Sequence, residues 1–483
     1  MWGRGSRSDS AFGDAADAPF VIGGLVVVTV LLGAFTVMLD ASALDVWTGL
    51  IVFLILMSAS VPLLRWVARK EDDPWLFKVL FGALVLHLLF AMIRYFVIFV
   101  VYKGNGDAGI YHEAGAIFSR RFRDGDPIHP IALVENFPIE SQRIGDFVGL
   151  LYTVTGPSAY AGFFLFTYVC FWGQVLVIRA FKVAVPEGDY RRLALLVLFL
   201  PSLLFWPASI GKEALMIACL GIIVYGGALL LAPRPKLRGG VYFVLGTVLI
   251  LLIRPHVALM SIGGLGLALT VGLMAGFRGE GGGGAGRGRA FRLVGLVAVI
   301  VLAGVGSTRL GETFKENSDG STAGLEQATS QSARGGSEFT PSAVTGPTKL
   351  PGGLVTVFFR PFPWEARNLN SLIAGGESLV LIGLFVTSWR RLLSLPKLAL
   401  RRPFLIFCAV YVLLFAIAFS YLANFGILAR QRVQVIPILL IFLALPKASG
   451  KIFPSVRATE DDSGRPATVD AGAGGARLVD PIP

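Results

Sequence analysis

Long apolar runs recur along almost the whole chain, and they constrain its fold more than any other feature. They extend from Phe20 to Leu445, and some, such as Val433–Leu445, are apolar on every face. A hydrocarbon core of about 30 Å needs about 20 apolar residues in a helix, whereas barrel strands would show short alternating segments. The sequence therefore predicts an all-α protein, a polytopic transmembrane helix bundle of about 12 spans.

The runs divide the chain into an N-terminal segment (1–19), a membrane domain (20–446) and a low-complexity tail (447–483), which we expect to be disordered. The runs Val241–Ile253 and Val433–Leu445 are short for a full crossing. The expected spans are Phe20–Leu39, Val46–Leu64, Leu76–Val101, Ser158–Ile178, Leu193–Ser209, Ala214–Ala232, Val241–Ile253, Val257–Phe277, Phe291–Gly306, Ser371–Ser388, Pro403–Leu422 and Val433–Leu445.

Composition excludes several other classes of protein. A hydrophobic content of 54%, a charged content of 15% and a mean hydropathy of +0.70 are not those of a soluble domain. The net charge of +12 sits in short blocks between spans, which indicates orientation signals and lipid headgroup contact rather than nucleic-acid binding. Cys170, Cys219 and Cys408 lie inside apolar runs, so neither a disulfide framework nor a cysteine metal site is expected.

Basic residues gather in alternate loops, and this asymmetry predicts the orientation. Five loops share the pattern, and an alternating count of spans puts them on one side, which should be cytoplasmic. Both termini are then cytoplasmic, and the protein is expected in the cytoplasmic (inner) membrane. The loop residues are Arg65, Arg69, Lys70 and Lys78; Arg179, Lys182, Arg191 and Arg192; Arg234, Lys236 and Arg238; Arg278, Arg287, Arg289 and Arg292; and Arg390, Arg391, Lys397, Arg401 and Arg402.

The opposite, extracytoplasmic side holds two long segments, 102–157 and 307–370. The first begins with a glycine-rich turn, and its patterns at Ala108–Phe122 and Ile144–Val154 predict two interfacial helices. The second is rich in Ser, Thr and Gly from Ser318 to Ser342, which is typical either of a loop that closes over a substrate or of a plain spacer.

Polar residues gather at the extracytoplasmic edge, whereas His87 and Arg94 are the charged or titratable exceptions that we expect inside the spans. An interhelical hydrogen bond and snorkelling explain these two. The edge residues are Asp107, His112, Glu113, Lys212, Glu213, Arg254, His256, Arg360, Glu365, Arg367, Arg430 and Arg432. Any one of them could be an ordinary interfacial anchor.

Three outward breaks between helices should bring cations of this set together. Lys212 and Glu213 follow such a break in the first turn of a helix, where free N–H groups favour a phosphate. Arg254-Pro255-His256 makes the second break and Asn424–Arg432 the third, which should bring Arg430 and Arg432 to the surface. With Arg360, these cations form the predicted donor-phosphate site.

Asp107 is the expected catalytic base, because it lies just beyond a span in a glycine-rich turn that allows close approach of a ligand. Glu365 is close to Arg367 and is expected to pair with it. A carboxylate beside an acceptor hydroxyl, with cations around a phosphate leaving group, suits sugar transfer from a lipid phosphate. The chain has no recognisable nucleotide-binding motif, so the donor should arrive through the membrane.

The sequence around the first long segment resembles the GT-C superfamily of integral-membrane glycosyltransferases. The similarity lies in Gly106-Asp107-Ala108-Gly109-Ile110-Tyr111-His112, an Asp-x-x-x-Tyr pattern, and in Leu150–Ser158 and Pro201–Glu213. The resemblance implies a polyprenyl-phosphate-linked sugar as donor, an extracytoplasmic cell-envelope glycan or lipid-linked acceptor, and in some members a divalent metal, which Asp107, His112 and Glu113 could hold. Substrate contacts would come from Tyr111, His112, Glu113, Glu213, His256, Glu365 and Arg367.

Other functions fit the sequence as well. A polymerase of lipid-linked repeat units would use the same arginines for a pyrophosphate leaving group. A lipid-linked saccharide flippase or another transporter usually has polar residues and broken helices near the midplane, where we expect little besides His87 and Arg94. A membrane scaffold without catalysis is the remaining alternative.

Overall fold

The computed structural model describes residues 18–38, 43–126, 139–277, 338–367 and 369–448, with the isolated positions 293 and 297. All the helices given below lie in the unit that spans residues 1–447. Over these ranges the secondary structure is helical, and the β-bridge between Glu338 and Asn424 is isolated. The predicted all-α class is therefore confirmed for the part of the chain that is described.

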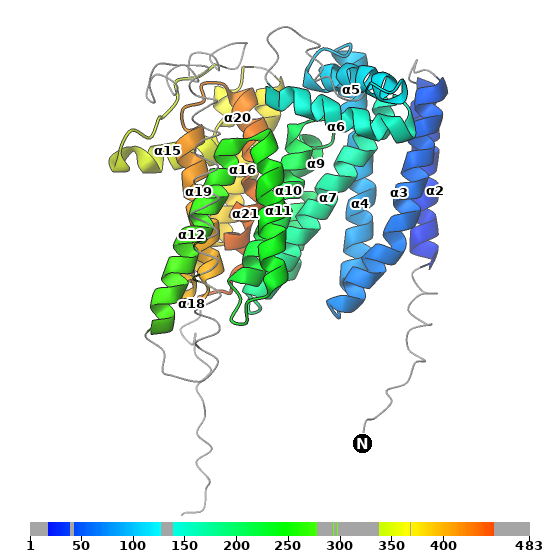
Figure 1. Ribbon diagram of the computed structural model, residues 1–483. Coiled ribbons are helices and arrows are strands. Elements are labelled where there is room, and N and C mark those ends of the chain that lie inside the picture. The colour runs from blue at the N-terminus through cyan, green and yellow to red at the C-terminus, as the bar shows by residue number, and fades with distance from the viewer. Residues whose placement is uncertain are drawn as a thin grey trace, which may run out of the picture. The chain divides into compact units, whose positions relative to one another are not determined.

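The N-terminal helices α2 (Ala18–Met38), α3 (Ala43–Lys70) and α4 (Pro74–Tyr95) run side by side along the bundle (Figure 1). α4 begins where it does because the Asp73 side chain accepts a hydrogen bond from Trp75 N at 3.1 Å and Pro74 occupies the first helical position. It continues as a π-helical turn, η1 (Phe96–Val101), a form that is rare in proteins and frequent at functional sites.

Helices α5 (Asp107–Arg123) and α6 (Ile139–Thr155) lie across one end of the bundle, which we call the α5 end (Figure 1). They pack closely because Gly115 faces Val148 and Gly149 faces Phe118, at positions where any Cβ would clash. Exposed apolar residues such as Phe122 and Leu150 alternate with charged ones along them. The two helices expected in this segment are therefore present, and their position at the membrane interface stays a prediction.

The most buried of the long apolar helices are α7 (Ala159–Ala184) and α10 (Lys212–Leu230), and α11 (Leu237–Ile253) packs against α10. Gly173 of α7 lies against the backbone of α10 at Ala218, and Gly221 of α10 lies against Gly173. Small residues of this kind let two helix backbones approach in a membrane, where packing replaces hydrophobic burial as the driving force. α11 starts at Leu237, before the expected Val241, so the helix is longer than the apolar run that predicted it.

The expected span Leu193–Ser209 is wrong as a single helix. It is divided into α8 (Tyr190–Phe199) and a short helix α9 (Pro201–Phe205), followed by a turn up to Gly211. Pro201 has no N–H for a helical bond and forces the preceding Leu200 out of the helical region, to φ −66° and ψ 128°. The apolar run therefore contains a helix break.

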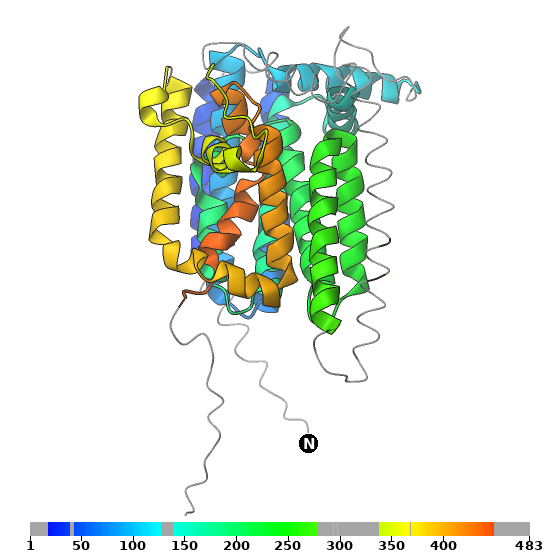
Figure 2. The same cartoon turned by 90° about the vertical axis from the view of Figure 1, so that its left-hand side faces the viewer.

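The C-terminal half begins with α12 (Pro255–Phe277), and its later helices are bent or short (Figure 2). α16 (Leu369–Thr387) turns by 61° into α17 (Trp389–Leu392) and α18 (Leu395–Arg401), and α20 (Phe425–Arg432) turns by 59° into α21 (Ile436–Leu439) and η4 (Leu440–Ala444). α19 (Pro403–Phe419) packs beside α12. Before α16 come η2 (Pro347–Lys349), α15 (Leu350–Phe359) and η3 (Pro363–Glu365).

Five helices of the described part are long and apolar enough to cross a membrane, or up to seven if each bent pair is one span. This pattern is that of a multi-pass membrane protein. The number of twelve stays a prediction, because Phe291–Gly306 lies almost wholly outside the described residues. The terminal segments before residue 18 and after residue 448 and the loop 307–337 also lie outside them.

Candidate functional site

Asp107 opens α5 at the α5 end, immediately after a tight glycine-rich turn. Gly104 and Gly106 have φ of +77° and +135°, a region that favours glycine, and a Cβ on Gly109 would clash with the carbonyl oxygen of Gly104. The Asp107 side chain is 46% exposed, and its Oδ2 lies 2.6 Å from Nη2 of Arg430. Asp107 is thus held by α20 although 323 positions separate the two residues in the chain.

Glu213 lies in the first turn of α10, as expected from the outward break before it. Its side chain is only 3% exposed, and its Oε2 accepts a hydrogen bond of 3.1 Å from Arg430 Nη2. Its Oε1 lies 2.8 Å from Arg430 Nε and 3.6 Å from Arg254 Nη2, but neither group donates to it with hydrogen-bond geometry. One oxygen of a buried carboxylate therefore keeps capacity to bind a donor.

Arg254 and Arg430 reach this cluster from the second and third outward breaks. Arg254 ends α11 just before Pro255 opens α12, and it donates to the side-chain oxygen of Gln431. Arg430 belongs to α20, whose start is fixed by Asn424 accepting from Gly426 N at 2.8 Å and Ile427 N at 3.1 Å. The structure thus brings four predicted site residues, Asp107, Glu213, Arg254 and Arg430, to one place.

Lys212 and His256 lie at the edge of this cluster. Lys212 is the first residue of α10, and His256 is the second residue of α12. The His256 ring lies 5.9 Å from the ring of Phe419, and Lys212 and Arg254 are the cations that act on it electrostatically. The cluster therefore contains more cations than carboxylates, which favours an anionic ligand.

Tyr111 and His112 point from α5 into the protein, whereas Glu113 is exposed. Burial, and then the negative charge of Asp107, raise the pKa of Tyr111 to about 12, so its hydroxyl remains a donor at neutral pH. Tyr152 OH lies 2.8 Å from His112 Nδ1, and burial lowers the pKa of His112. His112 is therefore neutral near pH 7.

Asp107, His112 and Glu113, which could have held a divalent metal, point in different directions. Within the described ranges, no three His, Cys, Asp or Glu side chains converge as metal ligands. Asp107 faces Arg430, His112 faces Tyr152 and Glu113 faces outward, because successive positions on a helix point in different directions.

Arg360 and Glu365 form a separate pair, and the expected pairing of Glu365 with Arg367 is wrong. Arg360 donates to Glu365 from Nε at 3.0 Å and from Nη2 at 2.5 Å, and this arginine lowers the pKa of the carboxyl group, against the effect of partial burial. The Arg360 guanidinium also covers the stacked rings of Phe339 and Phe425, at 4.8 and 5.2 Å. Arg367 is exposed, since the turn η3 directs Glu365 back toward Arg360.

Arg432 does not reach the surface, in contrast to the prediction. Its side chain is fully buried and donates to Arg360 O at 3.1 Å, to Ser378 Oγ at 3.2 Å and to Glu377 Oε2 at 3.5 Å. Glu377 also accepts from Ser202 N, at the start of α9, at 3.1 Å. These contacts hold Arg432 inside the bundle, between Arg360, Ser378 and Glu377.

The expectation that the spans contain little besides His87 and Arg94 is therefore incomplete. Glu377 lies within α16, inside the expected span Ser371–Ser388. The apolar residues on both sides of it keep the hydropathy of this run high. His87 does bond across helices, with Nε2 at 3.0 Å from Gln174 Oε1, and Gln174 Nε2 donates to Leu203 O at 3.3 Å. Gln174 and Glu377 both bind backbone groups of the broken segment around α9.

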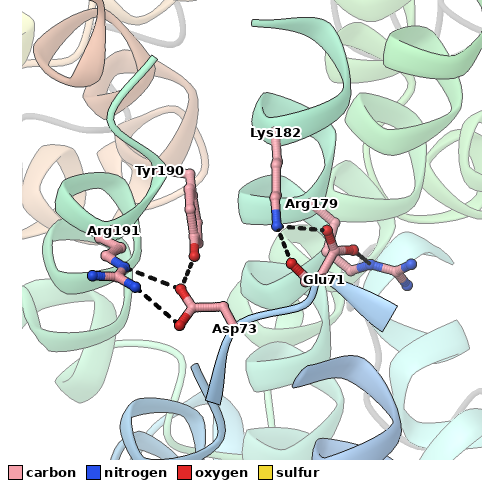
Figure 3. Close-up of polar contacts among 6 residues, drawn as sticks. All are labelled: Glu71, Asp73, Arg179, Lys182, Tyr190 and Arg191. Carbon is pink, nitrogen blue, oxygen red and sulfur yellow. Dashed lines mark hydrogen bonds and ion pairs between the residues drawn. The ribbon is translucent and has the colours of Figure 1, made fainter. Parts of the chain in front are cut away.

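The opposite end of the bundle has its own group of charges, in the turn between α3 and α4 (Figure 3). Glu71 pairs with Arg179 at 3.0 Å and with Lys182 at 3.2 Å. Asp73 accepts from Arg191 through two bonds of 3.0 Å and from Tyr190 OH. Many of the basic residues that predicted the orientation are thus engaged in contacts between helices.

No protein-family model matches the sequence, and searches of characterised proteins and of solved structures likewise give no match. Two carboxylates, two arginines and a protonated tyrosine meet where α5 and α6 cover one end of the bundle.

Proposed function

We propose that this chain is an integral-membrane glycosyltransferase that moves a sugar from a polyprenyl-phosphate-linked donor to a glycan or lipid-linked acceptor. The observation that supports this proposal is the contact of Arg430 with both Asp107 and Glu213, beside Arg254. It joins a partly exposed carboxylate, suited to proton transfer, to a buried cationic region, suited to a phosphate.

In the proposed reaction Asp107 is the general base. Its Oδ1 has no hydrogen bond to any described residue, so it can accept the proton of the acceptor hydroxyl. The hydroxyl oxygen then bonds to the anomeric carbon of the sugar, and the bond from that carbon to the phosphate oxygen breaks. Arg254 and Arg430 stabilise the negative charge on the leaving phosphate.

The proposed orientation puts the α5 end on the extracytoplasmic side of the cytoplasmic membrane, with both termini cytoplasmic. Basic loops at the opposite end, including Arg69 and Lys182, support it. A cysteine introduced by Asp124→Cys, in the exposed segment after α5, should react with an impermeant maleimide in intact cells. Reaction only after lysis would reverse the orientation.

The proposal predicts that Asp107→Asn removes activity without removing the protein. The substitution keeps the size of the side chain but cannot accept a proton, so product formation should fall about a hundredfold to ten-thousandfold. The measurement is sugar transfer by purified protein in detergent micelles, from a panel of polyprenyl-phosphate sugars that gives product with the parent chain.

Asp124→Asn is the matched control, because Asp124 is an exposed carboxylate at the other end of the same helix. It should leave the rate within about twofold of the parent. If Asp107→Asn also retains the parent rate at equal protein level, Asp107 has no part in the chemistry, and the base would have to be Glu213.

A repeat-unit polymerase would use the same geometry with a pyrophosphate leaving group. Supplying lipid-diphosphate oligosaccharides as substrates in the same assay separates it from the transferase.

Transport of a lipid-linked saccharide is a second candidate, because Glu377 and Arg432 are buried beside the short helix α9, where the expected span is broken. A transporter would move the lipid in vesicles but form no new glycosidic bond in micelles.

A further inference from the structure

Arg94, in the last turn of α4, has an unusual environment for a half-buried arginine. Its guanidinium carbon lies 4.5 Å from the centroid of the Phe205 ring and 5.5 Å from that of Trp206. Its Nε is buried without a hydrogen bond, and no described residue forms a hydrogen bond or ion pair with the side chain. A buried cation without a counter-ion is costly, so this arrangement indicates that a partner is missing.

The neighbouring charges show where that partner would lie. Arg430 and Glu213 are the charged groups with the largest electrostatic effects on Arg94. Glu213 is already shared by Arg430 and Arg254, so it does not neutralise a third arginine. Arg430 repels both Arg94 and Arg254, so an anion bound beside Arg430 would offset this repulsion.

Other buried or half-buried arginines near the α5 end have acceptors. Arg360 binds Glu365, Arg430 binds Asp107 and Glu213, and Arg432 binds carbonyl oxygens and Ser378. Stacking on Phe205 and Trp206 fixes the plane of the Arg94 guanidinium but uses none of its N–H groups. A guanidinium so fixed is prepared for bidentate binding of a phosphate.

The lipid surroundings favour a phosphate that is attached to an apolar chain. α4 is one of the helices apolar enough to span the membrane, and Ile93, Val100 and Val101 near Arg94 are exposed apolar residues. An isoprenoid chain can lie against such a surface while its phosphate reaches inward. The π-helical turn η1 begins two residues after Arg94, so the helix departs from regular α-helical geometry there.

We propose that Arg94 is a third phosphate-binding arginine, which takes an oxygen of an isoprenoid-linked phosphate together with Arg254 and Arg430. The proposal rests on the proposed function in its choice of ligand, but it assigns a role to a residue that interfacial snorkelling had explained. Phe205 and Trp206 orient the guanidinium and do not themselves contact the phosphate.

The test is binding of farnesyl phosphate to the full-length protein in detergent micelles, measured by titration calorimetry. Arg94→Gln should weaken binding about tenfold or more, and Arg94→Lys, which keeps the charge, should weaken it less. Arg65→Gln is the matched control, because the Arg65 guanidinium also stacks on an aromatic ring, that of Phe77 at 5.5 Å. Arg65 lies near the C-terminal end of α3, away from the α5 end of the bundle. This variant should bind like the parent.

Separate titrations with inorganic phosphate and with phosphatidylglycerol distinguish the source of the phosphate. Farnesyl phosphate should bind more tightly than either, and tighter binding of phosphatidylglycerol would make Arg94 a contact for bulk lipid, against the proposal. Protection of Arg94 from phenylglyoxal by farnesyl phosphate, followed by mass spectrometry, tests the parent protein without any substitution. Absence of protection would overturn the role of Arg94.

The outcomes also separate this inference from the proposed function. If Arg430→Gln weakens binding and Arg94→Gln does not, the phosphate site remains and Arg94 is not part of it. If neither variant weakens binding, or if the parent protein binds no farnesyl phosphate, the phosphate site itself is wrong and both proposals fail.

Discussion

The two ends of the bundle both join carboxylates to basic side chains, but they differ in how completely the carboxylates are hydrogen-bonded. At the opposite end, Glu71 and Asp73 lie in one turn, and their partners lie between Arg179 and Arg191. No buried oxygen of these two carboxylates lacks a hydrogen bond. This group of charges joins neighbouring helices through its own ion pairs.

At the α5 end the partners come from elements that are far apart in the chain, and the bonding is incomplete. Arg430 is shared between Asp107 and Glu213, Oε1 of Glu213 lacks a hydrogen bond, and Arg94 has no acceptor among the described residues. Keeping buried charged groups without hydrogen bonds lowers the free energy of unfolding, a cost that proteins commonly accept at functional sites. The comparison therefore favours the α5 end as the site of chemistry and the opposite end as a structural contact.

Arg430→Gln should have the largest effect of any substitution in this comparison. It removes a proposed phosphate ligand, so activity should fall at least about a hundredfold, and it leaves Glu213 buried with only Arg254 at 3.6 Å. Breaking a buried ion pair costs about 3 kcal/mol. Activity and the midpoint of thermal unfolding, measured on the same purified protein, should both decrease.

The double variant Arg430→Gln with Glu213→Gln separates these two losses. Since it removes the uncompensated buried charge, it should recover most of the unfolding midpoint while remaining inactive. Recovery of activity as well would mean that Arg430 serves only to neutralise Glu213, and the difference between the two ends would then disappear.

Asp73→Asn should have the opposite result, a loss of stability with unchanged activity. The substitution weakens the bonds to Arg191 and Tyr190, and since Arg191 is more than half exposed, the loss should be only about 1–2 kcal/mol. Asp72→Asn is the matched control, because Asp72 is exposed in the same turn. Its unfolding midpoint should equal that of the parent. A fall in activity of the folded Asp73→Asn protein would contradict the structural role.

Much of the fold follows from local sequence. Apolar runs predicted the helices, and the proline or glycine before Lys212, after Arg254 and around Asp107 predicted the turns that now border the site. These features depend on a few neighbouring residues, so they can be recognised without knowing the tertiary structure. The prediction of a single span from Leu193 to Ser209 was wrong because Pro201 breaks the helix within an otherwise apolar run.

The pairing of charges could not be predicted in the same way. Contact of Arg430 with Asp107 depends on how helices distant in the chain pack. The burial of Arg432 had a signal in the sequence: it is two residues from Arg430, roughly 200° around a helix, so both could not face the same side. Glu377 was missed because a single carboxylate hardly alters the hydropathy of an apolar run.

The smallest expected effect concerns His112, which joins α5 to Tyr152 of α6 beside the site. Burial holds its pKa below the ordinary value of about 6.5, although the charges of Asp45 and Glu113 act to raise it. The unfolded chain therefore binds a proton that the folded chain does not, and stability should fall as the pH decreases below about 6.5, by less than about 1.4 kcal/mol per pH unit. The midpoint of thermal unfolding, measured from pH 7.5 to 5.5, should fall more steeply for the parent than for His112→Gln. Equal slopes would show that His112 titrates alike in the folded and unfolded states, and its burial between α5 and α6 would then have no influence on how the α5 end responds to pH.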